Sequence, residues 1–324
     1  MTERPERNSL SKLTDFFAVA QAIRQIGWGL GFVIAIYFIG IAFNSFAWRA
    51  IFHSEWPGLI KILLPLRWIR ESINYLLPSA VFGGDIVGGR LLVARGYDMN
   101  TTTASIVVDK TMEATGLFFF VLAGIFILLE QGGNYSIAHW AVRGLAAISA
   151  MLIGFLLAQR WGFLKLLDKA VQRLTGKCGG TTGNTDIHDI VWKMYADGRR
   201  LTVAMFFHTL AWMPGALQVW LILRLMGHEI GWQAAFIIES ISQVVCAAAF
   251  IMPASLGAQE AAYMTVGMFF GVPPALGLAL SLVQRLKDVL VGILGLFLWQ
   301  GFEGRSLWEL WKGRRHDIGS NSKK

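Results

Sequence analysis

The run of residues 28–48 contains no charged side chain and is long enough to cross a membrane as a helix. A bilayer core about 30 Å thick requires about 20 consecutive apolar residues in helical conformation. Of the 324 residues, 55% are hydrophobic and only 15% are charged, which is too apolar for an ordinary soluble domain. Because backbone polar groups in lipid must be satisfied within the chain, these residues are expected to form helices. We therefore predict an all-α integral membrane protein.

Four further apolar runs qualify as transmembrane helices, so that about five full crossings are expected. These runs are 104–129, 140–157, 201–226 and 275–299. Two other apolar regions, 63–93 and 234–270, are interrupted by proline, glycine and acidic residues. Such interruptions favour two broken or re-entrant helix pairs over simple crossings.

These segments predict five regions along the chain. They are a polar N-terminal segment (1–26), a first membrane half (27–158) with a broken helix at 71–95, a basic loop (159–200), a second membrane half (201–300) with a broken helix at 239–270, and a basic tail (301–324). Within the loop, residues 163–174 have the periodicity of an interfacial amphipathic helix, and the Gly/Thr-rich residues 176–184 form a flexible connector. The excess of basic residues predicts that the loop and the tail are cytoplasmic.

Two segments that pair a proline with a carboxylate relate the halves of the chain. Pro78 and Asp85 recur as Pro253 and Glu260, with one separation (253 − 78 = 175 and 260 − 85 = 175). The same separation relates Gly96 to Gly271, Lys110 to Arg285 and Glu113 to Asp288, whereas Glu71-Ser72-Ile73 recurs as Glu239-Ser240-Ile241 after 168 residues. Identity across this register is low, so chance similarity is the alternative to an internal duplication.

The predicted order of crossings makes the two copies inverted relative to the membrane. Pro78, Gly83 and Gly84 would break the helix in the first copy, and Pro253 and Gly257 in the second. Helix ends that are freed near the membrane centre are tolerated where they line a cavity or bind a ligand. Inverted broken helices therefore indicate a transport protein.

Charged side chains gather around these breaks. They are Arg70, Glu71, Asp85, Arg90, Asp109, Lys110, Glu113, Glu239, Glu260, Arg285, Lys287 and Asp288. An ionised side chain in lipid costs at least about 2.5 kcal/mol, so these groups must pair with one another or bind a ligand. Any one of them could be a structural ion pair or could reach the membrane interface. As a set they predict a polar cavity.

Several other functions find no support in the sequence. Cys178 and Cys246 are the only cysteines, so neither a disulfide framework nor a multi-cysteine metal site is expected. No zinc-protease, nucleophile-elbow or phosphate-loop motif occurs, so no catalytic residue, metal or cofactor is predicted. The histidines, among them His53, His139 and His208, are scattered and are interpreted as structural. The net charge is +8, and the basic residues lie mostly between apolar segments. This placement indicates that they orient the protein in the membrane, and it does not indicate a nucleic-acid partner.

Three motifs together resemble the transmembrane region of lysylphosphatidylglycerol synthases, a flippase-like domain. They are residues 70–78 (Arg-Glu-Ser-Ile-Asn-Tyr-Leu-Leu-Pro), Gly83-Gly84-Asp85 with Arg90, and residues 253–260 (Pro-Ala-Ser-Leu-Gly-Ala-Gln-Glu). The last two are most similar to the hopanoid-biosynthesis-associated branch. The resemblance spans residues 28–301 and implies a multi-pass protein of the bacterial cytoplasmic (inner) membrane. It further implies that Arg70, Glu71, Asn74, Asp85, Arg90 and Glu260 surround a cavity for a lipid head group.

The chain differs from the full synthases at both ends. Those proteins carry a soluble aminoacyl-transferase domain after the membrane region, whereas this sequence ends at Lys324 with a short basic tail. Family members often have an additional N-terminal span, and residues 1–27 are too polar to supply one. The resemblance therefore implies lipid handling without lysine transfer.

Three functions remain open at this stage. The first is a lipid transporter or flippase that moves a hopanoid or a phospholipid. The second is a membrane enzyme that modifies a lipid head group with Glu71, Asp85 or Glu260 as an acid or base. The third is an accessory subunit that binds lipid-synthesis enzymes through the loop or the tail.

Overall fold

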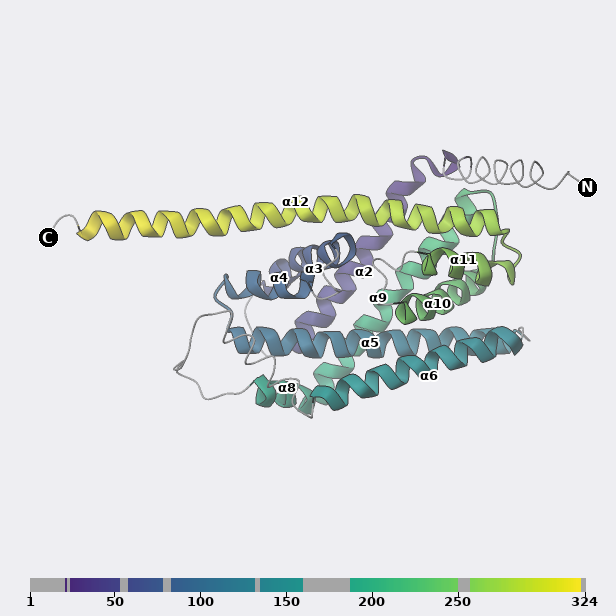
Figure 1. The fold of residues 1–324 in the computed structure, drawn as a ribbon, viewed down its shortest axis with the longest axis horizontal. Helices are drawn as coiled ribbons and strands as arrows, with labels where there is room; N and C mark the ends of the chain where they lie inside the picture. The colour runs from purple at the N-terminus through teal and green to yellow at the C-terminus, as the bar shows by residue number, and fades with distance from the viewer. Residues whose placement is uncertain are drawn as a thin grey trace, which may run out of the picture.

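A computed structural model describes residue 21 and residues 24–52, 58–77, 83–131, 135–159, 187–249 and 257–321. The described chain is helical and contains no strand (Figure 1). Its helices are α2 (Gly29–Ile51), α3 (Leu59–Leu76), α4 (Gly83–Val93), α5 (Met99–Glu130), α6 (Tyr135–Ala158), α8 (Ile187–Ala196), α9 (Gly198–Leu225), α10 (Trp232–Ala248), α11 (Ala258–Met268) and α12 (Pro274–Asn321).

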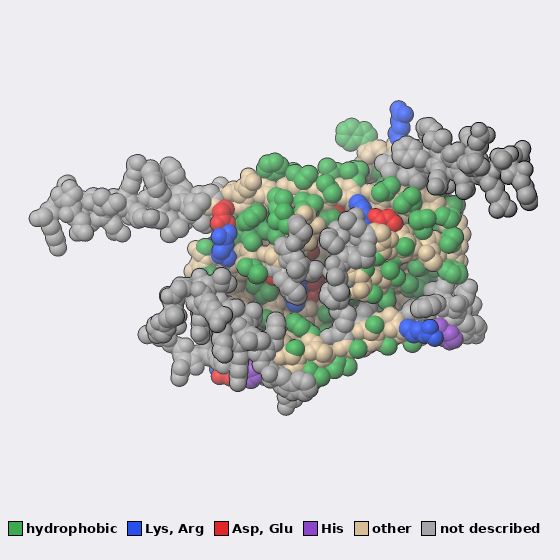
Figure 2. All heavy atoms as spheres, viewed as in Figure 1, with side chains coloured by type: hydrophobic (Ala, Val, Ile, Leu, Met, Phe, Trp, Pro, Cys, Tyr) green, Lys and Arg blue, Asp and Glu red, His purple; other side chains and the backbone are tan. Residues whose placement is uncertain are grey.

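The helices confirm an all-α membrane protein. Among the described residues, α2, α5 and α9 are both long and apolar enough to cross a bilayer, and residues 142–158 of α6 and 232–248 of α10 form shorter apolar helices. Each of the five predicted crossings coincides with one helix, namely α2, α5, α6, α9 or α12, and extends at most one residue beyond it. Large apolar side chains such as Phe32, Phe126 and Phe297 are more than half exposed, and hydrophobic atoms cover much of the face in Figure 2. Such an apolar surface is suited to contact with the lipid of a membrane.

The helix bounds carry the repeat that the sequence register predicts. Helices α4 and α11 both have 11 residues, and their first and last residues are each 175 positions apart, as are the first residues of α5 and α12. Gly96 and Gly271 precede α5 and α12 with φ angles of 90° and 78°, a backbone conformation that favours glycine. The order long helix, shorter helix, 11-residue helix and long helix thus occurs as α2–α5 and again as α9–α12.

Equivalent helices of the two copies run in opposite directions. In Figure 1, α2 and α9 lie side by side and antiparallel, and α5 and α12 also point in opposite directions. Gly40 allows the close approach of α2 to α9, because a Cβ there would lie 3.3 Å from the carbonyl oxygen of Ala211. The first helices of the two copies therefore pack closely against each other.

The predicted broken helices correspond to two helix pairs. Helix α3 packs on α4, and α10 packs on α11. At about 1.5 Å per residue, the 11 residues of α4 or α11 extend only about 16 Å, too short to cross a bilayer core. Pro78 and Pro253, to which the sequence assigns the breaks, lie outside the described residues.

The polar regions are described in part. The predicted interfacial helix at 163–174 and the connector at 176–184 lie outside the described residues, as does most of the segment 1–26. The end of the loop forms α8, which packs on α5 through Ile187, Val191 and Met194. Helix α12 runs without interruption from the second membrane half through the predicted tail to Asn321.

Candidate functional site

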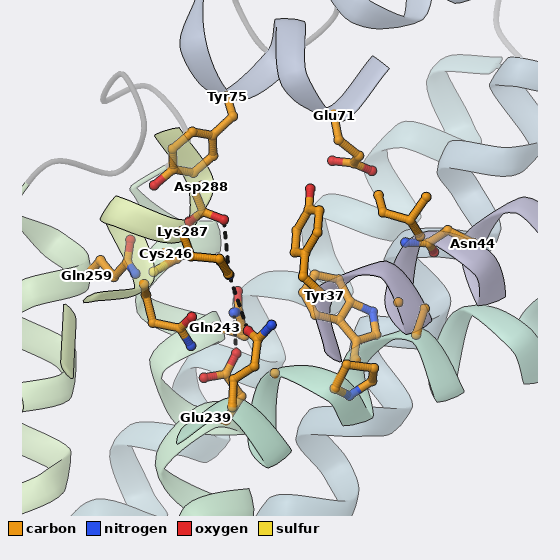
Figure 3. Close-up of a pocket in the computed structure, with 18 of the residues that line it drawn as sticks. Tyr37, Asn44, Glu71, Tyr75, Glu239, Gln243, Cys246, Gln259, Lys287 and Asp288 are labelled. Carbon is orange, nitrogen blue, oxygen red and sulfur yellow. Dashed lines mark hydrogen bonds and ion pairs between the residues drawn. The ribbon is translucent and has the colours of Figure 1, made fainter. Parts of the chain in front are cut away.

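A cavity of about 350 Å³ lies between the two repeats (Figure 3). Helices α2, α3 and α5 of the first copy and all four helices of the second copy contribute to its wall. Its polar and aromatic lining residues are Tyr37, Asn44, Glu71, Tyr75, Glu113, Trp212, Gln218, Glu239, Gln243, Gln259, Tyr263, Gln284, Lys287 and Asp288. The cavity therefore brings polar side chains of both copies together.

Lys287 is the one basic residue among the described residues that line the cavity. Its Nζ atom lies 3.0 Å from Asp288 Oδ1 and 3.2 Å from Gln218 Oε1, and 5.0 Å from the centre of the Tyr37 ring. The amide of Gln218 in turn donates to the backbone carbonyl of Val33 on α2. Lys287 thus links α12 to α9 and α2, and three carboxylates besides Asp288 share the cavity with it.

A buried cluster of charges lies behind the cavity wall in the first copy. Arg67 Nη2 lies 2.6 Å from Glu71 Oε1 and 3.1 Å from Glu113 Oε1, and both carboxylates line the cavity. Arg67 Nη1 and Arg70 Nη2 each lie 3.0 Å from Asp109 Oδ2. The side chains of Arg67 and Asp109 are fully buried. Buried ions of this kind are tolerated only in well-formed pairs, so the cluster fixes α3 against α5.

The cluster extends to three other helices. Arg70 Nε donates to Asp85 of α4 over 2.8 Å, and its guanidinium lies 4.3 Å from the centre of the Trp48 ring of α2. His208 of α9 lies with Nε2 3.1 Å from Asp109 Oδ1 and with Nδ1 2.9 Å from Asn44 Oδ1. One neutral tautomer of His208 can donate to only one of these two oxygens.

The second copy has a smaller set of polar contacts. Arg285 binds Glu260 through two hydrogen bonds, of which the one from Nη2 measures 3.0 Å. Glu260 also accepts a hydrogen bond of 2.8 Å from the backbone N–H of Gly257, which caps the first turn of α11. Glu239 accepts one hydrogen bond from Gln243 and one from Tyr263, both of 2.7 Å.

Four of the predicted site residues line the cavity, namely Glu71, Glu113, Glu239 and Asp288. Arg70, Asp85 and Asp109 lie in the buried charge cluster, and Glu260 and Arg285 form the pair at the start of α11. Asn74 accepts a hydrogen bond of 2.7 Å from the backbone N–H of Gly84 and so joins α3 to α4. Arg90 is 58% exposed and pairs with Glu303 of α12.

The three described glycines that were predicted as helix breaks lie at different positions relative to α4 and α11. Gly83 is the first residue of α4, and Gly257 immediately precedes α11 with a φ of 82°. Gly84 lies inside α4, where a Cβ would overlap the carbonyl oxygen of Arg70. Gly84 therefore allows close contact between α3 and α4.

The sequence prediction omits several residues that the structure brings to the site. Arg67 and His208 belong to the charge cluster, and uncharged polar residues such as Gln218 and Gln243 line the cavity. A helical period of polar residues in apolar helices would have identified some of these, since Gln284, Lys287 and Asp288 share one face of α12. Among the described residues, no group of His, Cys, Asp and Glu side chains could hold a metal ion.

Helix α8 lies outside the spans and is held to the membrane part by Tyr195. The Tyr195 hydroxyl donates to Gln159 Oε1 over 2.8 Å and lies 2.9 Å from Thr111 Oγ1. Burial raises the pKa of the Tyr195 hydroxyl above its ordinary value, so the group keeps its proton at neutral pH. The loop that joins the two repeats is thus attached to α5 and to the end of α6.

The fold and the cavity define a polytopic all-α membrane protein built from two antiparallel four-helix repeats around this cavity. The model of one family, the lysylphosphatidylglycerol synthase TM region, matches residues 9–295, and the chain belongs to this family. The family resemblance predicted from the two broken-helix motifs is thereby confirmed. Membership of this family associates the protein with membrane lipids. Comparison with curated proteins and with solved structures gave no match.

Proposed function

We propose that this protein is a flippase-like transporter of a membrane lipid. The head group enters the cavity between the repeats while the acyl or terpenoid tail stays in the bilayer. The two repeats then alternate in opening the cavity to either leaflet. Family membership and the antiparallel order of the copies, which is typical of secondary transporters, support this proposal.

The observation that carries the proposal is the position of the cavity. It lies at the contact between the repeats, where relative movement changes access, and its volume of about 350 Å³ is at the lower end of the range for ligand pockets. Its wall has amide, hydroxyl and charged groups, which suit a polar head group and not an apolar tail. A chamber of this size accommodates a head group without the rest of the lipid.

We further propose a hopanoid or a phospholipid as cargo, in agreement with the branch that residues 253–260 resemble. The proposed location is the bacterial inner membrane, with the loop 159–200 and the C-terminus in the cytoplasm. Lipid-synthesis enzymes would supply the cargo and are proposed as partners. Lipid analysis of separated inner and outer membranes, with and without the protein, tests the cargo and its destination.

The test of transport is a proteoliposome assay with fluorescent phospholipids and a membrane-impermeant quencher. We expect the protein to bring inner-leaflet lipid within reach of the quencher. We expect Asp288→Asn to slow this movement, because Asp288 lies in the cavity wall and holds Lys287. Asp189→Asn, the same chemical change at an exposed position on α8 outside the cavity lining, is the matched control and should keep the wild-type rate.

Absence of lipid movement with every lipid supplied would contradict a transporter. A change in the mass of the supplied lipid would instead favour an enzyme that modifies the head group. For that second function, Glu71 and Glu113 are the candidate acid and base, because both line the cavity and share Arg67.

A further inference from the structure

Glu239 differs from the other carboxylates of the cavity because no described cation contacts it; Lys287 acts on it only from a longer distance. Glu71 and Glu113 pair with Arg67, and Asp288 pairs with Lys287. No Lys, Arg or His nitrogen among the described residues lies within 4.0 Å of the Glu239 carboxylate, although the residue is only 3% exposed. A buried ion without a counter-ion is costly in a low dielectric environment, and binding a proton removes that cost.

The internal repeat supplies a direct comparison. Glu71 in the first copy and Glu239 in the second occupy the same place in the repeated Glu-Ser-Ile motif. Four residues before Glu71 stands Arg67, whose guanidinium contacts it. Four residues before Glu239 stands Ala235, which is buried and cannot pair with a charge. The equivalent carboxylate therefore contacts a cation in the first copy but not in the second.

The two partners of Glu239 can serve either protonation state. A glutamine side chain offers both an N–H donor and a carbonyl acceptor, and a tyrosine hydroxyl can donate or accept. Gln243 and Tyr263 donate to the two carboxylate oxygens in this structure. By rotation of the Gln243 amide or of the Tyr263 hydroxyl, either partner could instead accept a hydrogen bond from a protonated Glu239. The site thus satisfies both forms without movement of the backbone.

Several titratable groups surround Glu239, and Glu71, Tyr37 and Tyr75 also line its cavity. Tyr263 of α11, Lys287 and Asp288 of α12 and Cys246 of α10 interact electrostatically with it, and Glu113 of α5 lines the same cavity. The other helices packed on α10 present apolar side chains such as Phe120, which contacts Phe236, and glycines. Gly215 of α9 faces the carboxylate itself, Gly124 of α5 faces Ser240, and Gly144 of α6 faces Val244.

We propose that Glu239 is a proton-binding site that couples lipid movement to proton movement. The carboxylate takes a proton from water in the cavity to become a carboxylic acid, and returns it to water when the occupancy of the cavity changes. This inference rests on the proposed transport function. In this scheme Glu239 binds the proton, and the lipid head group binds the other residues of the cavity wall.

The experiment measures lipid movement and proton flux together in proteoliposomes that carry a pH-sensitive dye and a fluorescent phospholipid. We expect an imposed pH gradient to change the rate of lipid movement by the wild-type protein. In Glu239→Gln the gradient should have no effect and the proton flux should be lost. Glu229→Gln, at an exposed position outside the cavity, is the control and should retain both.

The possible failures are distinguishable. If the wild-type protein moves lipid at a rate that no pH gradient changes, proton coupling is wrong and the transport function stands. If no lipid moves under any gradient, the transport function is wrong. Proton binding is then decided by infrared difference spectra of the purified protein with and without phosphatidylglycerol vesicles.

In those spectra, a band of a protonated carboxyl group should appear or disappear when the vesicles are added. The band should be absent from Glu239→Gln, and it should shift in frequency in Tyr263→Phe, which lacks the hydroxyl that contacts the carboxylate. Tyr263→Phe keeps the test valid if Glu239→Gln does not fold. An unchanged spectrum, or a band that Glu239→Gln retains, would overturn the assignment.

Discussion

Glu260 and Arg285 form an ion pair at the same repeat positions at which Asp85 and Lys110 face each other in the first copy. In the second copy the contact is direct and has two hydrogen bonds. In the first copy Lys110 Nζ lies 3.6 Å from Asp85 Oδ2 and 3.1 Å from Glu113 Oε2, and Arg70 contacts the other oxygen of Asp85. The second copy thus joins this pair directly, whereas in the first copy Arg70 and Glu113 also contact its two members.

This difference predicts unequal coupling energies in two double-mutant cycles. Glu260→Gln combined with Arg285→Gln should give an interaction energy of about 1–2 kcal/mol, as expected for contacting charged residues. The cycle of Asp85→Asn with Lys110→Gln should give a smaller value, because Arg70 shares the carboxylate. Thermal unfolding in detergent micelles measures both. Equal coupling in the two cycles would contradict the geometric difference.

Removing the charge of Asp109 should destabilise the protein strongly. Asp109→Asn leaves Arg67 and Arg70 buried with one carboxylate fewer, and the loss of one partner of a buried ion pair costs about 3 kcal/mol or more. The measurement is the shift in unfolding midpoint in detergent. Asp189→Asn makes the same chemical change at an exposed position on α8 and should leave the midpoint within experimental error. Similar midpoints for the two variants would show that the cluster adds no stability.

Gly84 and Gly154 should respond oppositely to alanine. In Gly84→Ala the new methyl group would overlap the backbone of Arg70, so α4 must move away from α3 and both stability and lipid movement should fall. Gly154 is also helical, but a Cβ there meets nothing within 4 Å. Gly154→Ala should therefore be neutral, or more stable by up to about 1 kcal/mol through helix propensity. Unfolding midpoints and transport rates of the pair decide this.

The architecture could be predicted from the sequence because its signals are local. Long apolar runs define the crossings, and the 175-residue register places the two short helices at matching positions. The contents of the cavity could not be predicted in the same way. Which side of a helix faces the cavity depends on its neighbours, and for that reason Asp109 is buried in the charge cluster while Glu113, one turn later, lines the cavity.

His208 shows where sequence reasoning ends. Its partners are Asn44 and Asp109, which are 164 and 99 residues away along the chain. No local pattern marks a histidine that will meet two polar groups from other helices. Arg67 is similar, since the sequence shows its neighbour Glu71 but not its contacts with Asp109 and Glu113.

The orientation predicted from basic residues can be tested with single cysteines. In a Cys178→Ser/Cys246→Ser background, Arg199→Cys at the start of α9 should react with a membrane-impermeant thiol reagent only from the cytoplasmic side. Glu229→Cys, beyond the other end of α9, should react only from outside. Both positions are exposed. Reaction of Arg199→Cys from the outer side and of Glu229→Cys from the cytoplasmic side would show that the predicted orientation is wrong.

A bulky label on Cys246 should block lipid movement. Cys246 lies in the cavity wall between Gln243 and Gln259 in Figure 3, and a Cys178→Ser variant leaves it as the only thiol of the chain. A maleimide attached there would occupy space that the head group requires, so labelling should stop transport in proportion to the labelled fraction measured by mass spectrometry. The Cys178→Ser/Cys246→Ser protein, treated in the same way, should keep its rate. Complete labelling with an unchanged rate would contradict passage of the head group through this cavity, because the label would fill much of its volume of about 350 Å³.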